Sequence, residues 1–147
     1  MRTVRFTVYG EPKAKGRPRV SVRKSGDGER TFARAYTPKQ TVIYENLVRT
    51  TYQQMVGAVK LEGEISADIV GVFPIPKSIS KKKRQMMINK EILHTKKIDC
   101  DNLAKIILDS LNGIAYEDDK QVVRLYVEKI YGEHPRVEVE LKCCPAN

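Results

Sequence analysis

Two short blocks of carboxylates stand out in an otherwise basic chain of 147 residues. The first block holds Asp99 and Asp101, and the second holds Asp118 and Asp119. A run of apolar residues at helical spacing separates them. If the chain turns back after that helix, three carboxylates converge, and their mutual repulsion favours a hard divalent cation such as Mg²⁺ or Mn²⁺. One interpretation of the spacing is therefore a metal site built from Asp99, Asp101 and either Asp118 or Asp119.

A second interpretation assigns these aspartates to helix capping. Asp99 and Asp101 come just before the apolar run, where free N–H groups and the helix dipole favour a carboxylate. A helix needs only one cap, however, so the other aspartate requires another explanation. Lys105 follows one turn after Asp101 on the same side, and Asp109 one turn later. Lys105 is either a fixed positive charge beside a reacting phosphate or a member of an ordinary i, i+4 ion pair worth ~0.2–0.5 kcal/mol.

The segments around the carboxylates predict how they are positioned. The helix is expected to be about three turns long and to end at Asn112-Gly113, where glycine can adopt the left-handed cap conformation. Its predicted buried stripe is Leu103, Ile106, Ile107, Ser110 and Leu111. A loop over residues 92–98 leads into it, and a strand from Val122 follows the second block. We expect this helix–turn–strand return to bring Asp118 or Asp119 beside the start of the helix.

The same residues carry a resemblance to a known family. Residues 98–113, Ile-Asp-Cys-Asp-Asn-Leu-Ala-Lys-Ile-Ile-Leu-Asp-Ser-Leu-Asn-Gly, together with Asp-Asp-Lys-Gln-Val at 118–122, resemble the signature of the RusA family of Holliday junction resolvases. The N-terminal segments 8–12 and 16–19 also resemble the way many members begin. The resemblance implies a Mg²⁺-dependent endonuclease that acts as a homodimer on four-way DNA junctions. It further implies that Asp99, Asp101, Asp119 and Lys105 are catalytic, with Asp118 the less certain acid.

One position departs from the family pattern. Many relatives carry proline or a basic residue where this chain has Ile98. The catalytic acids are intact, but a phosphate contact from the residue before Asp99 is put in doubt. Lys96 and Lys97 are candidates to replace that contact.

The charge distribution agrees with a polyanionic partner. The formal net charge is +9. Residues 1–40 hold 11 Lys or Arg against 3 acids and residues 76–97 hold 8 against 1, whereas residues 98–147 hold 6 against 10. Two basic blocks flanking an acidic cluster indicate a nucleic acid guided to a cation-binding spot, although a solvated surface is the simpler alternative. The candidate DNA-binding residues are Lys13, Lys15, Arg17, Arg19, Lys81, Lys82, Lys83, Arg84, Lys96 and Lys97.

The remaining pattern predicts a single α+β domain over residues 1–147, with helices packed on a mixed β-sheet. Strands are expected at 2–9 and 64–73. A hairpin is expected to pair residues 20–24 with 30–36 around a turn at 25–28. Its basic side chains are Arg23, Lys24, Arg30 and Arg34, with Arg19 at its base. A core helix is expected from Thr37-Pro38 to Gly57, with Thr37 as cap and an apolar period at Val42, Ile43, Asn46, Leu47, Thr50 and Met55. A second helix is expected from Ser78 or Ser80 to Lys90. The closing strands 122–131 and 136–142 are predicted to pair antiparallel.

Several classes are disfavoured. Three cysteines without a spacing framework argue against a disulfide scaffold, and His94 and His134 complete no zinc pattern and are expected in solvated loops. No signal peptide or membrane-spanning run is visible, so a soluble, cytosolic protein is expected. Three functions stay open: a junction-resolving nuclease, a nuclease of broader branched-DNA preference, and a non-enzymatic DNA-binding module.

Overall fold

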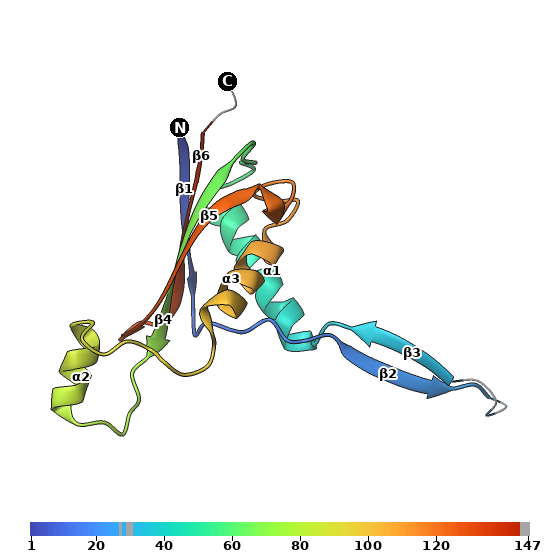
Figure 1. Ribbon diagram of the computed structural model, residues 1–147, viewed down its shortest axis with the longest axis horizontal. Helices are drawn as coiled ribbons and strands as arrows, with labels where there is room; N and C mark the ends of the chain where they lie inside the picture. The colour runs from blue at the N-terminus through green and yellow to red at the C-terminus, as the bar shows by residue number, and fades with distance from the viewer. Residues whose placement is uncertain (27, 29–30, 145–147) are drawn as a thin grey trace.

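A four-stranded mixed sheet is the centre of the fold (Figure 1). The computed structural model describes residues 1–26, 28 and 31–144. In the order β1-β6-β4-β5, the strands are β1 (Arg2–Tyr9), β6 (Arg136–Cys143), β4 (Ile65–Pro74) and β5 (Val122–Gly132). β6 pairs antiparallel with both β1 and β4, whereas β5 pairs parallel with β4. The expected α+β class with a mixed sheet is confirmed.

The two closing strands, β5 and β6, are not neighbours. β4 lies between them, so the predicted antiparallel pairing of residues 122–131 with 136–142 is wrong. A parallel neighbour requires a long crossover connection, and the two helices between β4 and β5 supply it. β4 is apolar enough to sit in the middle of the sheet, with Ile65, Ala67 and Ile69 buried on the helix side and Val72 and Phe73 buried near its end.

Two helices, α1 (Lys39–Met55) and α3 (Cys100–Ser110), cover one face of the sheet (Figure 1). The predicted stripe of α3 is confirmed, because Leu103, Ile106, Ile107, Ser110 and Leu111 are all fully buried. Burying each large aliphatic side chain contributes ~1.5–3 kcal/mol, so this stripe fixes the rotation of α3 about its axis. The opposite side of α3 is left for polar residues.

The buried face of α1 differs from the prediction. Its buried residues are Thr41, Tyr44, Val48, Thr51 and Tyr52, whereas the predicted core residues Val42, Ile43, Leu47 and Met55 are exposed. Two tyrosines and two threonines form most of this face, and two of their hydroxyls find backbone partners nearby. The Tyr52 hydroxyl donates to the Val59 carbonyl at 2.6 Å, and the Thr51 hydroxyl donates to the Leu47 carbonyl at 2.7 Å.

The start of α1 also differs. The N-cap residue is Pro38, and no side chain caps the helix, so the predicted cap at Thr37 is wrong. Proline fixes its own φ and carries no N–H, which allows the helix to begin directly after it.

A two-stranded hairpin, β2 (Arg19–Lys24) with β3 (Thr31–Tyr36), projects away from the sheet and helices (Figure 1). Val20 and Val22 face Ala35 and Ala33 across the hairpin, while Arg19 and Arg34 belong to the opposite face. The predicted hairpin is therefore confirmed as an antiparallel pair. Arg30, predicted as one of its cations, lies outside the described residues, as does the turn residue Asp27.

A small second core holds α2 (Lys81–Ile88) at one end of the sheet. It consists of Phe73, Ile75, Met87 and Tyr131, with Ile98 packed against it. Ser80 caps α2 by accepting a hydrogen bond from the Lys83 backbone N–H at 3.2 Å. Ile98 directly precedes Asp99, so its packing against this core positions the entry to α3.

His94 belongs to the second core. Its ring stacks on Phe73 with a centroid separation of 3.8 Å, and the side chain is buried. The expectation that His94 is a solvated loop residue is therefore wrong, whereas His134 is exposed as expected. The ring is large and flat enough to pack as an aromatic side chain, which a sequence pattern does not distinguish from a loop histidine.

The three cysteines, Cys100, Cys143 and Cys144, are free thiols, in agreement with the absence of a disulfide framework in the sequence. Over the part of the chain that the structure describes, none of the helices has the length and apolar character needed to cross a bilayer.

Candidate active site

A depression of about 520 Å³ lies between α3 and the extended N-terminal arm, residues 12–18. Its walls bring together carboxylates from α3 and its start with cations from both α3 and the arm. The lining residues are Lys15, Gly16, Arg17, Pro18, Asp99, Asp101, Asn102, Lys105 and Asp109. Asp99, Asp101 and Lys105, which the sequence predicts as site residues, therefore share one pocket.

α3 presents its polar residues along one side. Asp101, Lys105 and Asp109 follow each other at intervals of four residues, so they lie one above another on the side opposite the buried stripe. Asp99 is the N-cap residue by position, but its side chain makes no capping hydrogen bond. The capping interpretation of Asp99 is therefore wrong, and both carboxylates at the start of α3 are available to the depression.

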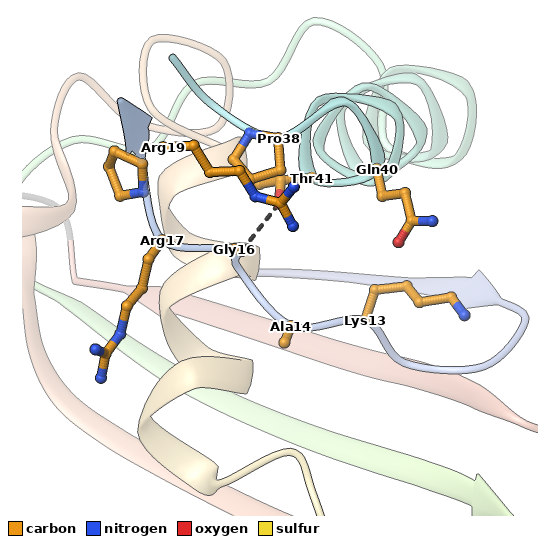
Figure 2. Close-up of a pocket in the computed structure, with 9 residues that line it drawn as sticks. Lys13, Ala14, Gly16, Arg17, Arg19, Pro38, Gln40 and Thr41 are labelled. Atoms are coloured by element: carbon orange, nitrogen blue, oxygen red, sulfur yellow. Dashed lines mark hydrogen bonds between the residues drawn. The ribbon is translucent and has the colours of Figure 1, made fainter. Parts of the chain in front are cut away.

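The arm is held against the two helices by specific contacts. The Lys15 backbone N–H donates to Asn102 Oδ1 at 2.9 Å, and the Gly16 N–H donates to Thr41 Oγ1 at 2.9 Å (Figure 2). A side chain at Gly16 would place its Cβ 2.8 Å from Pro38 and 2.9 Å from Thr41, so only glycine fits without a shift. These contacts make the arm a fixed wall of the depression.

Lys15 completes the attachment of the arm. Its Nζ lies 2.7 Å from Asp109 Oδ2 and 3.5 Å from Glu45 Oε2, which joins the arm to α3 and α1. Burial is the largest single influence and lowers the pKa of Lys15, but the hydrogen bonds and charge interactions with Asp109 and Glu45 together outweigh burial and raise it. Lys15 was predicted as a DNA-binding residue, and in the structure its charge is already paired with two carboxylates.

Asp118 and Asp119 differ in role. They begin the short 3₁₀ turn η1 (Asp119–Gln121), where Asp118 Oδ1 accepts a hydrogen bond from the Lys120 N–H at 2.8 Å. The Gln121 side chain accepts from the Asp118 N–H at 3.1 Å, which completes a capping box. The Lys120 N–H bond lowers the pKa of Asp118. Asp118 is therefore occupied as a cap, whereas Asp119 is not.

The Asp119 carboxyl lies beside the carboxyl of Asp109. The Asp119 backbone N–H is held by Asn112 Oδ1 at 2.8 Å. Burial raises the pKa of Asp119, and the neighbouring carboxylates Asp109 and Asp118 raise it further. Burial is the largest single influence on Asp109 and acts to raise its pKa, but the interactions with Lys15, Asp119 and Lys105 together outweigh burial, so the pKa lies below its usual value.

The chain return meets α3 at the other end from the one predicted. Asp119 contacts Asp109, which lies eight residues after Asp101, roughly 12 Å further along the helix axis. The expected return beside the helix start is therefore wrong. Within residues 1–26, 28 and 31–144, no three His, Cys, Asp or Glu side chains are close enough together to hold one ion.

Asp109 is the site residue that the sequence reasoning left without a role. It lines the depression with Asp99 and Asp101, and it contacts Asp119, Lys15 and Lys105. The Lys105 Nζ lies 3.7 Å from Asp109 Oδ2, so the i, i+4 ion pair expected as an alternative for Lys105 is present. The sequence signal that could have identified Asp109 is its spacing of four residues from Lys105 and eight from Asp101, which places the three side chains in line on one side of the helix.

A second depression, of about 420 Å³, lies on the other side of the arm (Figure 2). Lys13, Arg17 and Arg19 are among its lining residues, together with Pro38, Gln40 and Thr41 of the α1 start. Arg17 and the flanking Gly16 and Pro18 line both depressions. Figure 2 shows the Arg17 and Arg19 side chains leaving the arm in different directions.

The other predicted cations lie on α2 and the loop before α3. Lys81, Lys82, Lys83 and Arg84 are exposed, and Arg84 makes a long ion pair of 3.6 Å with Glu133. Lys96 and Lys97 are exposed beside Asp99 in sequence. α2 and the β2–β3 hairpin extend in opposite directions from the α3 start (Figure 1), so cationic segments flank the depression on two sides.

Comparison with known proteins covers the elements that build this site. The profile of the family described as endodeoxyribonuclease RusA matches residues 9–142. The chain is also 41% identical over 144 residues to "Uncharacterized protein YqaN" of Bacillus subtilis (strain 168), a match that spans 97% of each chain. Both matches include the arm, α3 and η1.

Proposed function

Because this chain belongs to the RusA family of endodeoxyribonucleases, we propose that it is a Mg²⁺-dependent nuclease that resolves Holliday junctions in DNA recombination and repair. Residues 1–147 would act as one endonuclease domain. The observation that carries the proposal is the shared depression, in which Asp99, Asp101, Lys105 and Asp109 face a fixed arm with Arg17. Uncapped carboxylates beside a basic wall suit a phosphodiester held next to a cation.

The donor set fits a hard divalent cation, Mg²⁺ or Mn²⁺. Asp99 and Asp101 have no capping bond to lose, and the contact between the Asp109 and Asp119 carboxyls is a repulsion that a cation relieves. We assign Asp99 and Asp101 as ligands at the start of α3, and Asp119 as a ligand beside Asp109, roughly 12 Å further along the helix, so the three carboxylates do not hold a single ion in this arrangement. Asp118 is the weaker candidate because it caps η1. A bound ion of this kind lowers the pKa of a coordinated water and polarises the scissile phosphate.

The cations of the site would orient the DNA strand. Lys105 is exposed on the depression, and its ion pair with Asp109 is long enough to be exchanged for a phosphate oxygen. There it would stabilise the charge that develops on the phosphoryl group. Lys13, Arg17 and Arg19 line the basic depression beside it and would contact neighbouring phosphates. Lys15 would hold the arm in place as its main role.

A four-way junction needs two matched cuts, which a two-fold homodimer supplies. The alternatives are a nuclease that accepts flaps and forks equally well and a DNA-binding module without activity. The last is disfavoured because its premise, that the aspartates are caps, does not hold for Asp99.

The deciding experiment is a cleavage assay on a mobile four-way junction, a flap and a linear duplex, with Mg²⁺ or with EDTA. We expect junction cleavage in Mg²⁺ only. Asp101→Asn should abolish cleavage while junction binding stays equal or becomes tighter, since negative charge near the phosphate is removed. Asp68→Asn, on the open face of the sheet, is the matched control and should cut normally. Normal cutting by Asp101→Asn would reject the metal site, and equal cutting of flaps would favour the broader nuclease.

A further inference from the structure

β5 forms one edge of the sheet, and its outer side has no strand partner in the described part of the chain. The strand is long, from Val122 to Gly132, and carries large exposed side chains. Val123 is 55% exposed, Leu125 48% and Tyr126 56%. Natural proteins rarely leave a long apolar edge uncovered, because its free N–H and C=O groups pair readily with another chain.

The open part of this edge is limited at both ends. The η1 turn precedes it, and the Lys129 Nζ donates to the Lys96 carbonyl at 2.9 Å, which brings the loop before α3 against the far end. Ile130 and Tyr131 are buried. The accessible window of the edge is therefore residues 123–128 of β5.

The two sides of this window have different chemistry. Arg124, Tyr126 and Glu128 lie across from Ser66, Asp68 and Val70 of β4 and so belong to the open face of the sheet. Leu125 and Val127 lie across from the buried Ala67 and Ile69 and belong to the helix face. The Tyr126 hydroxyl lies 3.3 Å from Glu128 Oε2, which agrees with a shared face.

We propose that β5 pairs antiparallel with β5 of a second copy of this chain, around a two-fold axis at Tyr126. In this register Arg124 lies opposite the partner subunit's Glu128, and by symmetry Glu128 lies opposite the partner's Arg124. Leu125 lies opposite the partner's Val127 on the other face. Each position then meets its complement, as an isologous interface requires.

Neighbouring registers lack this complementarity. An axis at Arg124 would place the two Arg124 side chains opposite each other, and an axis at Glu128 would do the same with the two acids. Like charges directly opposite on adjacent strands are unfavourable. The charge pattern of the strand therefore selects the register at Tyr126 over these two.

The pairing has a consequence for the candidate active site. A two-fold axis perpendicular to the sheet leaves each copy of α3 on the same face of the joined sheet. Both depressions then face the same side, which is the arrangement that two cuts in one junction require. This inference rests on the two-fold dimer of the proposed function, but its tests measure association and do not depend on cleavage.

The first test is a charge swap read by sedimentation equilibrium. Arg124→Glu and Glu128→Arg, each alone, should weaken dimerisation by about tenfold or more, and the double swap should restore it. Arg2→Glu, on the opposite edge strand β1, is the control and should leave the dimer constant unchanged. A monomeric wild type, undiminished dimers in both single swaps, or a double swap that stays weak would each overturn the interface.

The second test is symmetric crosslinking, which also covers a swap variant that folds poorly. In a Cys100→Ser, Cys144→Ser background, Tyr126→Cys places two thiols at the axis and should form a disulfide dimer on oxidation. Arg124→Cys, which faces the partner's Glu128, should not. Equal crosslinking at both positions would overturn the register. If the protein cuts junctions as a monomer, the β5 interface is rejected while the proposed nuclease activity stands. If a β5-linked dimer forms but does not cut, the proposed nuclease activity is rejected while the interface stands.

Discussion

The Lys15 ammonium lies 2.7 Å from the Asp109 carboxylate and joins the N-terminal arm to α3 across 94 residues of sequence. Both side chains are largely shielded, with exposed fractions of 24% and 19%. This pair holds one wall of the depression against the other. It also leaves Asp109 placed between the arm and Asp119.

Breaking this pair should destabilise the fold and disturb the site. We expect Asp109→Asn and Lys15→Met each to lower the free energy of unfolding by about 1–3 kcal/mol, because a partly buried charge loses its hydrogen-bonded partner. The double variant should cost less than the sum, which a double-mutant cycle in urea measures. Lys105→Met is the control, since its exposed ion pair with Asp109 should be worth ~0.5 kcal/mol or less. Strict additivity would mean that the arm is held without this pair.

The two adjacent aspartates before β5 should respond differently to the same change. Asp118→Asn should keep most of the cleavage rate, because asparagine also caps a helix start. Asp119→Asn should lose cleavage, since the acid next to Asp109 becomes neutral and a poorer ligand for a cation. Initial rates of junction cleavage in Mg²⁺ compare the two. A larger loss in Asp118→Asn would exchange their roles.

The capping role of Asp118 has its own stability readout. Asp118→Ala should lower the free energy of unfolding, whereas Asp118→Asn should change it little. Thermal unfolding of both variants separates loss of the cap from loss of chemistry.

The four consecutive cations of α2 should contribute to DNA binding as an electrostatic surface. Changing Lys81, Lys82, Lys83 and Arg84 to glutamine should weaken junction binding and reduce the slope of log K against log salt, by ~0.9 for each phosphate that is no longer neutralised. Titrations by fluorescence anisotropy at several salt concentrations measure the slope. Arg5→Gln with Lys142→Gln, on the open face of the sheet, is the control. An unchanged slope in the α2 variant would return these residues to a solvated surface.

His94 should make the fold sensitive to mild acid. Burial lowers its pKa, and the charges of Lys129 and Lys96 lower it further. In the unfolded chain the imidazole takes up a proton near its ordinary pKa of ~6.5, which the folded state resists. The unfolded state therefore binds more protons, and the free energy of unfolding should fall as the pH drops from about 7 to 5.

Urea denaturation at several pH values measures this effect. His94→Phe keeps an aromatic ring on Phe73 and should show a flatter dependence of stability on pH than wild type. His134→Phe, at the exposed turn before β6, is the matched control and should follow the wild-type profile. If the profiles of wild type and His94→Phe coincide, His94 is not the group responsible.

The local features of the site could be predicted from the sequence. The α3 stripe, its end before Gly113 and the Ser80 cap depend on neighbours within a few residues, where helical period and capping chemistry decide the outcome. The motif that carries the family resemblance is also a continuous segment. The grouping of Asp99, Asp101 and Lys105 at the start of one helix therefore follows from residue spacing.

Features that depend on distant segments were decided only by the tertiary structure. The strands 122–132 and 136–143 are consecutive, yet β4 separates them because a parallel crossover places β5 at the edge. Likewise, α1 buries its tyrosines in place of Ile43 and Leu47, and Tyr52 packs edge-on against Phe6 of β1, a contact that forms only once the helix lies on the sheet.

The position of Asp119 shows the same division within the site itself. The sequence determined that a carboxylate would return to α3 after Gly113, because the helix stop and the following strand are local signals. It did not determine which end of α3 the carboxylate meets, since that depends on where β5 joins the sheet. Packing therefore placed Asp119 against Asp109, with Lys15 of the arm bound to the same carboxylate.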